Sequence, residues 1–312
     1  MVTVTMDRMR DEVAQGLARS QKRISPKFFY DRRGSELFER ITRQPEYYPT
    51  RAERRLLRDH MPGWISGLRP ESLVELGAGA ADKTTIILDA MHDAVEKPVY
   101  VPIDISGEFL DGVASTLRDA YPAAEVRPVV ADMTMAIRVP FDLPRPALFA
   151  LLGGTIGNFP RREGVDQLRR ARSEMGPGDR FLLGCDLQKD VRVLEAAYND
   201  AAGVTAAFNL NVLTVLNREL GADFDPADFR HHAFYNRGEH QIEMHLVARR
   251  PVTITLPGAG RFHFRQGESL HTEVSCKYDR PGVEAMLRQA GLSLEHWAEA
   301  RPGFALLLAR PV

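Results

Sequence analysis

Residues 73–90 read Leu-Val-Glu-Leu-Gly-Ala-Gly-Ala-Ala-Asp-Lys-Thr-Thr-Ile-Ile-Leu-Asp-Ala. The mostly apolar start predicts a buried strand, Gly77 and Gly79 predict a turn, and the residues after Lys83 predict a helix. Glycine lets the backbone approach a ligand closely, and the start of a helix offers unpaired N–H groups. This corner between a strand and a helix is typical of nucleotide-binding domains.

The residues around the two glycines distinguish between two kinds of nucleotide ligand. The dinucleotide fingerprint G-x-G-x-x-G/A ends in a small residue, whereas Asp82 stands at that position here. An acidic side chain there would repel a pyrophosphate at the helix N-terminus. Glu75, just before the turn, offers a second carboxylate able to face a cationic ligand such as a sulfonium. The pattern therefore favours S-adenosylmethionine (SAM) over NAD.

Two further predicted strands end in acidic residues. Residues 99–104 end at Asp104, placed to accept hydrogen bonds from ribose hydroxyls, and residues 126–132 end at Asp132, able to accept from the exocyclic amine of adenine. A glycine-rich turn alone is often only a tight connection, and acids at strand ends are often helix N-caps. The order of a glycine turn followed by two acidic strand ends favours a cofactor site.

The remaining pattern predicts an α/β fold with a Rossmann-like sheet. Strands and helices alternate from residue 73 to about 188, which predicts a doubly wound parallel sheet whose ligands lie beyond the carboxyl ends of the strands. A strand at 147–152 runs into a glycine-rich loop that contains Asn158, and another strand follows at 180–186. A helix at 281–289 and strands at 292–297 and 304–309 predict a late hairpin at the sheet edge, as in SAM-dependent methyltransferases.

The chain divides into three predicted parts. Residues 1–60 predict a helical N-terminal segment, in which Ser35 could cap a helix. Residues 191–278 change from helical to β-type alternation and predict an inserted α+β module. Residues 61–190 and 279–312 form the predicted Rossmann-like methyltransferase domain.

Composition excludes several classes of function. The chain has 312 residues with 41 basic and 42 acidic side chains, so a basic nucleic-acid-binding face is not expected. The start lacks the apolar stretch of a signal peptide, and no run is long enough to span a bilayer. We therefore expect a cytoplasmic protein without a membrane partner, and a monomer.

Cysteine and histidine spacings do not indicate a metal. Two cysteines, Cys185 and Cys276, imply neither a disulfide framework nor a zinc knuckle. Nine histidines lack a ligand spacing such as H-E-x-x-H. His240 and His245 are five apart in a predicted strand and would face opposite sides. We predict no metal cofactor.

Five sequence motifs say more about the family of this chain than its predicted fold does. Phe28-Phe-Tyr-Asp followed by Gly34-Ser-Glu-Leu-Phe stands near the start, and Gly154-Thr-Ile-Gly-Asn and Thr272-Glu-Val-Ser-Cys-Lys come later, with two more at residues 41–53 and 208–213. Together they resemble the L-histidine Nα-methyltransferases of ergothioneine biosynthesis. The resemblance covers nearly the whole chain, including the predicted insertion. It implies transfer of three methyl groups from SAM to the α-amine of histidine, which gives hercynine in the first step of that pathway.

The resemblance also implies a set of site residues. It places the cofactor site at Gly77, Lys83, Asp104 and Asp132, three of which the strand pattern favours independently. It assigns Tyr47, Asn158 and Tyr198 to the carboxylate and α-amine of the amino acid, with Tyr30 near the amine. Asn158 carries a donor and an acceptor and can bridge both groups. Tyr30 or a water near Asn158 could relay the proton that the amine must lose, and the tyrosine faces suit a quaternary ammonium.

Substrate choice is expected from Glu273 and Ser275. In an extended segment these residues face the same side, while Val274 points the other way. Glu273 can accept a hydrogen bond from one N–H of an imidazole, and Ser275 can hydrogen-bond the second ring nitrogen. Met244, on a predicted strand, is placed by the resemblance against the ring. By pattern alone, Glu-Val-Ser would be a solvated strand edge.

Two alternatives remain open. A methyltransferase of the same fold could act on another amino acid or small amine, although a buried Glu273 would be left unpaired against an apolar ring. The second alternative is a SAM-binding sensor without catalysis. A sensor would not need the amino-acid site, and therefore would not need Tyr30, Asn158 and Tyr198 together.

Overall fold

The computed structural model describes residues 6–312 apart from 80–82, 106, 134 and 136. The chain divides into two compact units. The large-sheet unit comprises residues 49–188 and 276–312, and the small-sheet unit comprises residues up to 48 together with 189–275. Each unit is therefore assembled from two separate stretches of chain. None of the described helices combines the length and apolar character needed to cross a bilayer.

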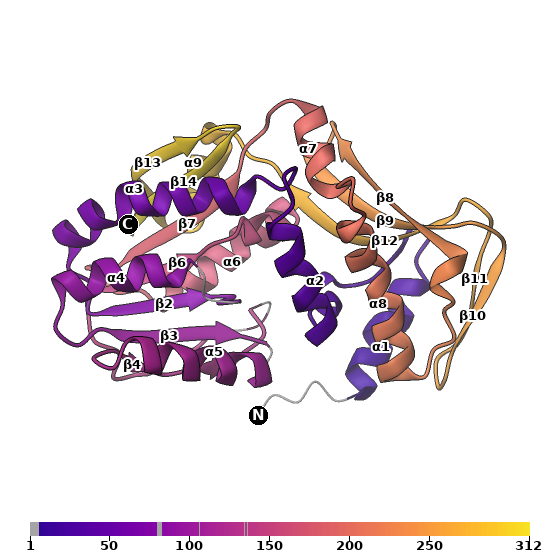
Figure 1. Cartoon of the computed structure of the whole chain (residues 1–312), viewed down its shortest axis with the longest axis horizontal. Helices are drawn as coiled ribbons and strands as arrows, with labels where there is room; N and C mark the ends of the chain where they lie inside the picture. Colours follow the sequence, from indigo (N-terminus) through magenta and orange to yellow (C-terminus); the bar gives the residue numbers. More distant parts are fainter. Residues whose placement is uncertain (1–5, 80–82, 106, 134, 136) are drawn as a thin grey trace. The chain divides into compact units, whose positions relative to one another are not determined.

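In the described residues, the large-sheet unit contains an 8-stranded sheet with the order β13-β14-β7-β6-β2-β3-β4, and β5 pairs with β3 (Figure 1). Its strands are β2 (Ser72–Leu76), β3 (Val99–Asp104), β4 (Glu125–Val126), β5 (Val129–Val130), β6 (Ala147–Leu151), β7 (Arg180–Asp186), β13 (Leu292–Ala300) and β14 (Phe304–Pro311). Strands β2 to β7 pair in parallel, whereas β14 is antiparallel to both β7 and β13. The predicted parallel sheet and late hairpin are confirmed.

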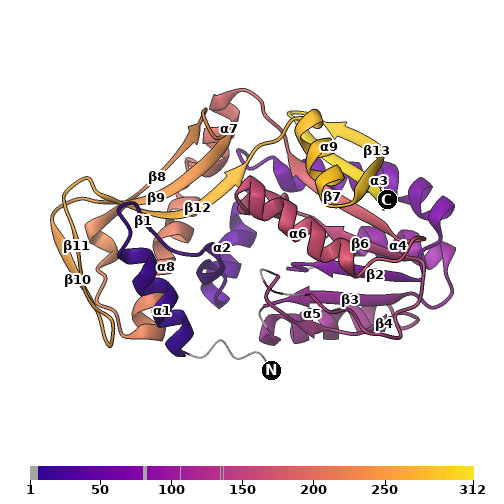
Figure 2. The same ribbon diagram turned by 180° about the vertical axis from the view of Figure 1, so that it is seen from behind.

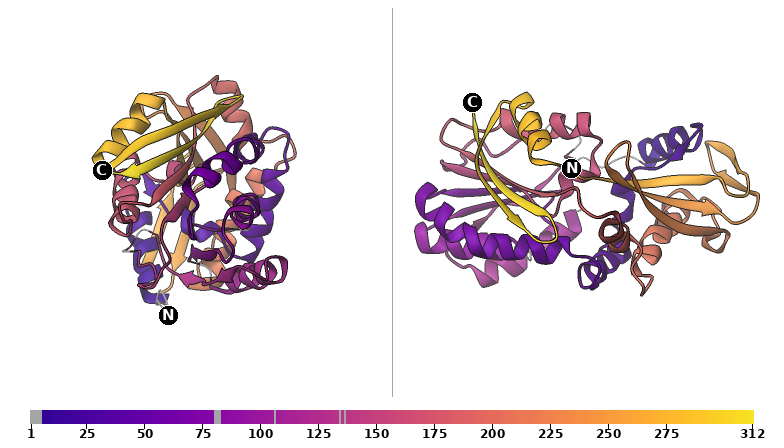
Figure 3. Two further views of the ribbon diagram at one scale, coloured as in Figure 1. Left: turned by 90° about the vertical axis from the view of Figure 1, so that its left-hand side faces the viewer. Right: turned by 90° about the horizontal axis from the view of Figure 1, so that it is seen from above.

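Helices cover both faces of this sheet (Figures 1, 2 and 3). They are α3 (Pro49–Leu68), α4 (Thr84–Ala94), α5 (Gly107–Ala120), α6 (Arg161–Ser173) and α9 (Arg280–Gln289), with the 3₁₀ turn η2 (Thr155–Asn158). Alternate strand residues enter two different cores, because successive side chains point to opposite faces. Leu73 packs in the core with α3 and α4, and Val74 packs in the core with α6 and α9.

The position of β2 determines where a ligand can bind in this unit. β2 lies between β3 and β6, so the order of the parallel strands reverses there. In open α/β sheets, ligands bind beyond the carboxyl ends of the strands at such a reversal. The residues that follow β2, β3 and β6 are therefore the candidates for a cofactor site.

The small-sheet unit contains, in its described part, a 4-stranded sheet with the order β1-β12-β9-β8 and a hairpin of β10 and β11. Its elements are α1 (Met6–Leu17), β1 (Lys22–Arg23), η1 (Pro26–Phe29), α2 (Arg32–Thr42), α7 (Val191–Tyr198), α8 (Val204–Leu220), η3 (Pro226–Asp228), β8 (Phe229–Asn236), β9 (Gln241–Ala248), β10 (Val252–Leu256), β11 (Gly260–Phe264) and β12 (Ser269–Cys276). Phe208 and Val212 of α8 share one core with Ile242 and Leu246 of β9. The apolar side chains of β9 thus face α8.

Two details differ from the sequence expectations. The predicted boundary at residue 60 falls inside α3, which belongs to the large-sheet unit from its first residue. Ser35 does not cap a helix: α2 begins at Arg32, and the Asp31 carboxylate caps it by accepting from the Gly34 N–H at 2.7 Å. Burial raises the pKa of Asp31, but hydrogen bonds from Arg218, Gly34 and Asn211 lower it overall.

The chain leaves and re-enters the large-sheet unit at two paired segments. Leu187 and Tyr278 form a parallel bridge, and the Gln188 N–H donates to the Tyr278 carbonyl at 2.8 Å. Beside them, the Lys277 ammonium lies 2.9 Å from the Asp186 carboxylate, with both side chains buried. A buried ion pair costs free energy if either partner is lost, so it fixes these two segments together.

Candidate functional site

The predicted glycine turn follows β2 directly. Gly77 and Gly79 have φ of +71° and +50°, a region that side chains other than glycine rarely adopt. The Gly77 N–H donates to the Ile103 carbonyl of β3 at 2.8 Å. A Cβ at Gly77 would lie 3.2 Å from the Met133 methyl group, so the turn also lies close to the segment after β5. The turn therefore brings the carboxyl ends of β2, β3 and β5 together.

The two predicted acidic strand ends lie on this same edge. Asp104 is the last residue of β3, and its carboxylate accepts weakly from the Gly79 N–H at 3.4 Å. It pairs with Val130 of β5, which Asp132 follows after one residue. Both aspartates are half-buried. Asp82, at the third fingerprint position, lies outside the described residues.

Lys83 is held by a carboxylate that the sequence analysis did not single out. Its ammonium lies 2.7 Å from Glu53 Oε2, and Glu53, on α3, is fully buried. Both Glu53 oxygens also accept from the Gly153 N–H, at 2.8 and 2.9 Å. Lys83 stands at the N-cap of α4. Glu53 therefore fixes a cation at a helix start, next to the loop that follows β6.

Glu75 does not have the role expected of it. Its side chain is 3% exposed, and its Oε2 accepts from the hydroxyls of Thr84 at 2.5 Å and Tyr100 at 2.7 Å. The carboxylate thus points into the interior and links β2 to α4 and β3, instead of facing a ligand. Burial raises the pKa of Glu75 to about 7, against the opposing effect of these two hydrogen bonds.

Asn158 belongs to the large-sheet unit. It ends η2, the short turn after β6, and is half-buried. Gly154 begins this turn in the left-handed region, with φ of +68°. Asn158 therefore follows the carboxyl end of a central strand, the edge on which the cofactor candidates also lie.

The other predicted substrate residues belong to the small-sheet unit, where an aromatic cluster contains three of them. Tyr30 lies edge-on to Phe38 at 5.8 Å between ring centroids, and Phe38 lies edge-on to Tyr47 at 6.3 Å. Tyr47 in turn lies edge-on to Tyr198 of α7, also at 6.3 Å. Segments that are far apart in sequence thus contribute to one tyrosine-rich cluster.

β12 connects this cluster to the predicted specificity residues. Glu273 and Ser275 are both buried, and the Tyr198 hydroxyl donates to Ser275 Oγ at 2.7 Å. The segment is a strand, as expected, with Val274 only half-buried between them. Met244 of β9 is 2% exposed, and its carbonyl accepts from the Thr272 hydroxyl of β12 at 3.0 Å. Tyr47, Tyr198 and Ser275 are thereby brought together.

Comparison with known proteins gives the decisive observation. A family model described as "Histidine-specific methyltransferase, SAM-dependent" matches residues 9–311. The chain belongs to this family. It is therefore a SAM-dependent N-methyltransferase.

Individual relatives agree with the family. The chain is 42% identical to the histidine N-alpha-methyltransferase of Mycolicibacterium smegmatis, with 96% of this chain and 94% of the relative covered. It is 41% identical to that of Mycobacterium tuberculosis, with the same shares covered. Ergothioneine biosynthesis protein 1 of Neurospora crassa is 29% identical over 90% of this chain and 32% of its own length. Among solved structures, the mitomycin 7-O-methyltransferase MmcR is 15% identical with a TM-score of 0.49, covering 99% of this chain and 69% of that one.

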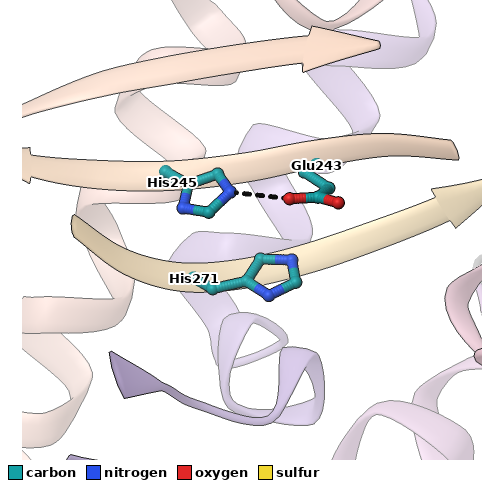
Figure 4. A group of neighbouring side chains, drawn as sticks. All are labelled: Glu243, His245 and His271. Atoms are coloured by element: carbon teal, nitrogen blue, oxygen red, sulfur yellow. Dashed lines mark hydrogen bonds and ion pairs between the residues drawn. The ribbon is translucent and has the colours of Figure 1, made fainter. Parts of the chain in front are cut away.

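The histidine-specific methyltransferase also carries a group of side chains that the sequence analysis missed. Among the described residues, Glu243, His245 and His271 bring three potential metal-binding atoms within 4.8 Å of one another (Figure 4). The signal available in the sequence was the spacing of Glu243 and His245, two apart on a strand and so on one face. His240, which was compared with His245 instead, lies in the turn before β9 with φ of +51°.

The buried Glu75 carboxyl should make stability depend on pH. Below pH 4.5 it is neutral in the folded and the unfolded chain alike, whereas between 4.5 and about 7 it ionises only in the unfolded chain. The folded state should therefore lose up to about 3 kcal/mol as the pH rises through this window, and no more above it.

We expect Glu75→Gln to remove this loss, so that the stability of the variant relative to wild type rises between pH 4.5 and 7. Chemical denaturation across that range measures the difference. Glu71→Gln, at an exposed glutamate just before β2, is the control. Parallel pH profiles for Glu75→Gln and wild type would contradict the assignment.

Proposed function

We propose that this methyltransferase transfers three methyl groups from SAM to the α-amine of L-histidine, which gives hercynine, the first step of ergothioneine biosynthesis. The observation that carries the proposal is the buried pair Glu273 and Ser275 on β12, with Ser275 hydrogen-bonded to Tyr198. A carboxylate and a hydroxyl on one strand can both hydrogen-bond the polar atoms of a ligand, so this arrangement favours a substrate with a polar side chain. The names of the relatives point to the same substrate.

Imidazole is the substrate side chain that this pair fits. Glu273 can accept an N–H from one ring nitrogen, and the Ser275 hydroxyl can donate to the other or accept from it. An indole or phenol ring cannot offer this pair the two hydrogen-bonding ring nitrogens of imidazole, which disfavours such substrates. Met244, buried on β9, is assigned to the ring as an adaptable apolar support.

The amino-acid end of histidine is assigned to Tyr47, Asn158 and Tyr198. Tyrosine hydroxyls can bind a carboxylate without introducing a fixed charge, and the Asn158 amide can donate to the carboxylate while it accepts from the amine. Tyr30 is assigned a position near the amine. The tyrosine faces provide cation–π attraction for the quaternary ammonium that the third methylation forms.

The cofactor end is assigned to Gly77, Lys83, Asp104 and Asp132. The Gly77 turn allows close approach of the backbone, and the Lys83 ammonium at the start of α4 suits the carboxylate of the methionine part of SAM. Asp104 is assigned to the ribose hydroxyls, and Asp132 to the adenine amine. These donors and acceptors match the polar groups of SAM.

In the reaction, the protein has to align the amine with the methyl group of SAM and to remove a proton from the amine. Bound SAM supplies an electrophilic methyl group on a sulfonium. An α-amine titrates near pH 8, so most of it is protonated at neutral pH and must lose a proton before each transfer. Asn158 and Tyr30 would orient the lone pair along the line of attack, and Tyr30 or a water beside Asn158 would pass the proton on.

One experiment tests substrate and reaction together. Purified protein is incubated with SAM and the twenty amino acids in one vessel, and the products are followed by mass spectrometry to completion. We expect three added methyl groups on histidine alone. Methylation of another amino acid would overturn the role of Glu273 and Ser275, and SAM binding without methylation of any amine would favour a sensor.

Glu273→Gln should weaken the binding of histidine without affecting the binding of SAM. The amide keeps the shape of the carboxylate but loses its charge, and a charge-assisted hydrogen bond contributes enough to change affinity about 10- to 100-fold. Calorimetric titration with each ligand measures both effects, and Glu239→Gln, at an exposed turn residue, is the control. An equal loss of both ligands would show that Glu273 is structural.

Glu53→Gln should weaken the binding of SAM through its effect on Lys83. The amide can still accept from Gly153, but it no longer holds the Lys83 ammonium in position by its charge. We therefore expect about a 10-fold rise in the KM for SAM with the KM for histidine unchanged. In a Lys83→Met background the same change should have little further effect. Additive losses in the double variant would show that Glu53 does not act through Lys83.

A further inference from the structure

The sheet of the small-sheet unit carries a row of stacked rings that the proposed reaction does not use. His232 stacks on Phe234 within β8, and Phe234 stacks on His245 of β9 with 5.5 Å between ring centroids. His245 then stacks on His271 of β12 at 4.7 Å. Residues that alternate with His245 along β9, such as Met244 and Leu246, belong to the core with α8. The row therefore lies on the opposite face of the sheet.

Three side chains in this row are metal-ligand types. Glu243 and His245 project from β9, and His271 projects from the neighbouring β12 toward the same region (Figure 4). One potential ligand atom from each lies within 4.8 Å of the others. Donors held by two paired strands are fixed by the sheet, so little of the main chain has to be ordered when an ion binds.

Glu243 and His271 each have hydrogen-bond partners outside the group. Glu243 Oε1 accepts from Asn236 Nδ2 at 2.8 Å and from Gln241 Nε2 at 2.9 Å, which leaves Oε2 toward His245. His271 Nε2 lies 3.1 Å from the Glu273 carbonyl. Because a carbonyl can only accept, Nε2 carries the proton, and Nδ1 keeps its lone pair. Such outer partners orient ligands at metal sites.

His245 is oriented in the same way. Its Nδ1 lies 3.1 Å from Ser269 Oγ, and its Nε2 lies 3.1 Å from Glu243 Oε2. Because the carboxylate accepts, a proton on Nε2 joins the two side chains. Ligand atoms around a tetrahedral Zn²⁺ lie about 3.4 Å apart. An ion could therefore bind Nε2 with a small change in distance once the ring proton has moved to Nδ1, where it would donate to Ser269 Oγ.

The ionisation states suit ligation near neutral pH. Burial lowers the pKa of both His245 and His271, so both imidazoles are neutral. Burial alone would raise the pKa of Glu243, but hydrogen bonds from Gln241, Asn236 and His245 lower it overall, so the carboxylate is charged. Neutral imidazoles and a carboxylate are the forms that bind a metal ion. His232 and Arg23 are the nearby basic groups that would oppose a cation.

We propose that Glu243, His245 and His271 form a binding site for a divalent transition-metal ion of the Zn²⁺ class. Two imidazole nitrogens and one carboxylate oxygen leave a fourth position for water. The rings of His245 and His271 are stacked, with 12° between their planes, so their lone pairs do not converge as they stand. Binding therefore requires the half-buried His271 ring to turn about its Cβ–Cγ bond and to leave its present hydrogen bond to the Glu273 carbonyl, so that Nδ1 can point its lone pair at the ion. This proposal differs from the sequence-based prediction that the protein has no metal cofactor.

Cobalt provides the probe, because Co²⁺ replaces Zn²⁺ and reports its coordination by visible absorption. Tag-free full-length protein, first treated with a chelator and dialysed, is titrated with Co²⁺ and then with competing Zn²⁺. We expect one equivalent to bind with intense tetrahedral bands, which Zn²⁺ abolishes, and a rise in Tm with Zn²⁺.

Variants determine whether the three side chains are the ligands. His271→Gln and Glu243→Gln should each lower Co²⁺ affinity at least about 10-fold and change the absorption bands. Ser269→Ala, which removes the hydroxyl beside His245 Nδ1 but none of the three proposed ligands, should weaken binding less and keep the bands. His263→Gln, at an exposed histidine on the β10–β11 hairpin, is the matched control and should bind as wild type does. Tm, measured without metal, reports whether each variant is folded.

Two outcomes would overturn the proposal. One is a Co²⁺ spectrum that is the same in His271→Gln as in wild type. The other is weak binding of several equivalents that His263→Gln reduces as much as His271→Gln does. Neither outcome bears on histidine methylation, so failure here is distinct from failure of the proposed function.

Discussion

The buried carboxylate of Glu53 is the interaction on which the large-sheet unit most depends at its ligand-binding edge. It joins α3 to Lys83 at the start of α4 and to the Gly153 N–H after β6. It also packs closely on β7 at Gly184. A Cβ added to this glycine would lie 1.8 Å from Glu53 Oε1, so any other residue there would displace the carboxylate. Four segments are therefore fixed around one charge. Such a charge is stable in the interior only with its cation and N–H partner in place, so the local geometry has few alternatives.

The sequence predicted the parts of the fold that depend on local pattern. Short-range signals predict the glycine turn at Gly77, the strands that end at Asp104 and near Asp132, and the hairpin that closes the sheet. Glu75 shows where such signals fail. A central strand of a parallel sheet is buried on both faces, so alternation cannot tell a side chain that points inward from one that faces a ligand. Only Thr84 and Tyr100 decide its direction.

The remaining features depend on pairings between distant parts of the chain. Glu53 lies 30 residues from Lys83 and 100 residues from Gly153. The approach of His271 to His245 follows from the pairing of β9 and β12, which no local spacing predicts. The small sheet thereby uses its two faces differently. Apolar residues on one face form the core with α8, and polar and ring side chains gather on the other.

The strand order of the large sheet has a consequence for how the chain can fold during synthesis. β14 follows all the other strands in the chain, yet it lies between β7 and β13 inside the sheet. Until it emerges from the ribosome, the edge of β7 has no partner on that side, and an unpaired edge is a template for aggregation. The small-sheet unit faces a similar delay, because β1 must wait for β12, whose residues come about 250 positions later. The large sheet can therefore be completed only after β14 has been made and the small sheet only after β12, and the strand edges that they cover stay unpaired until then.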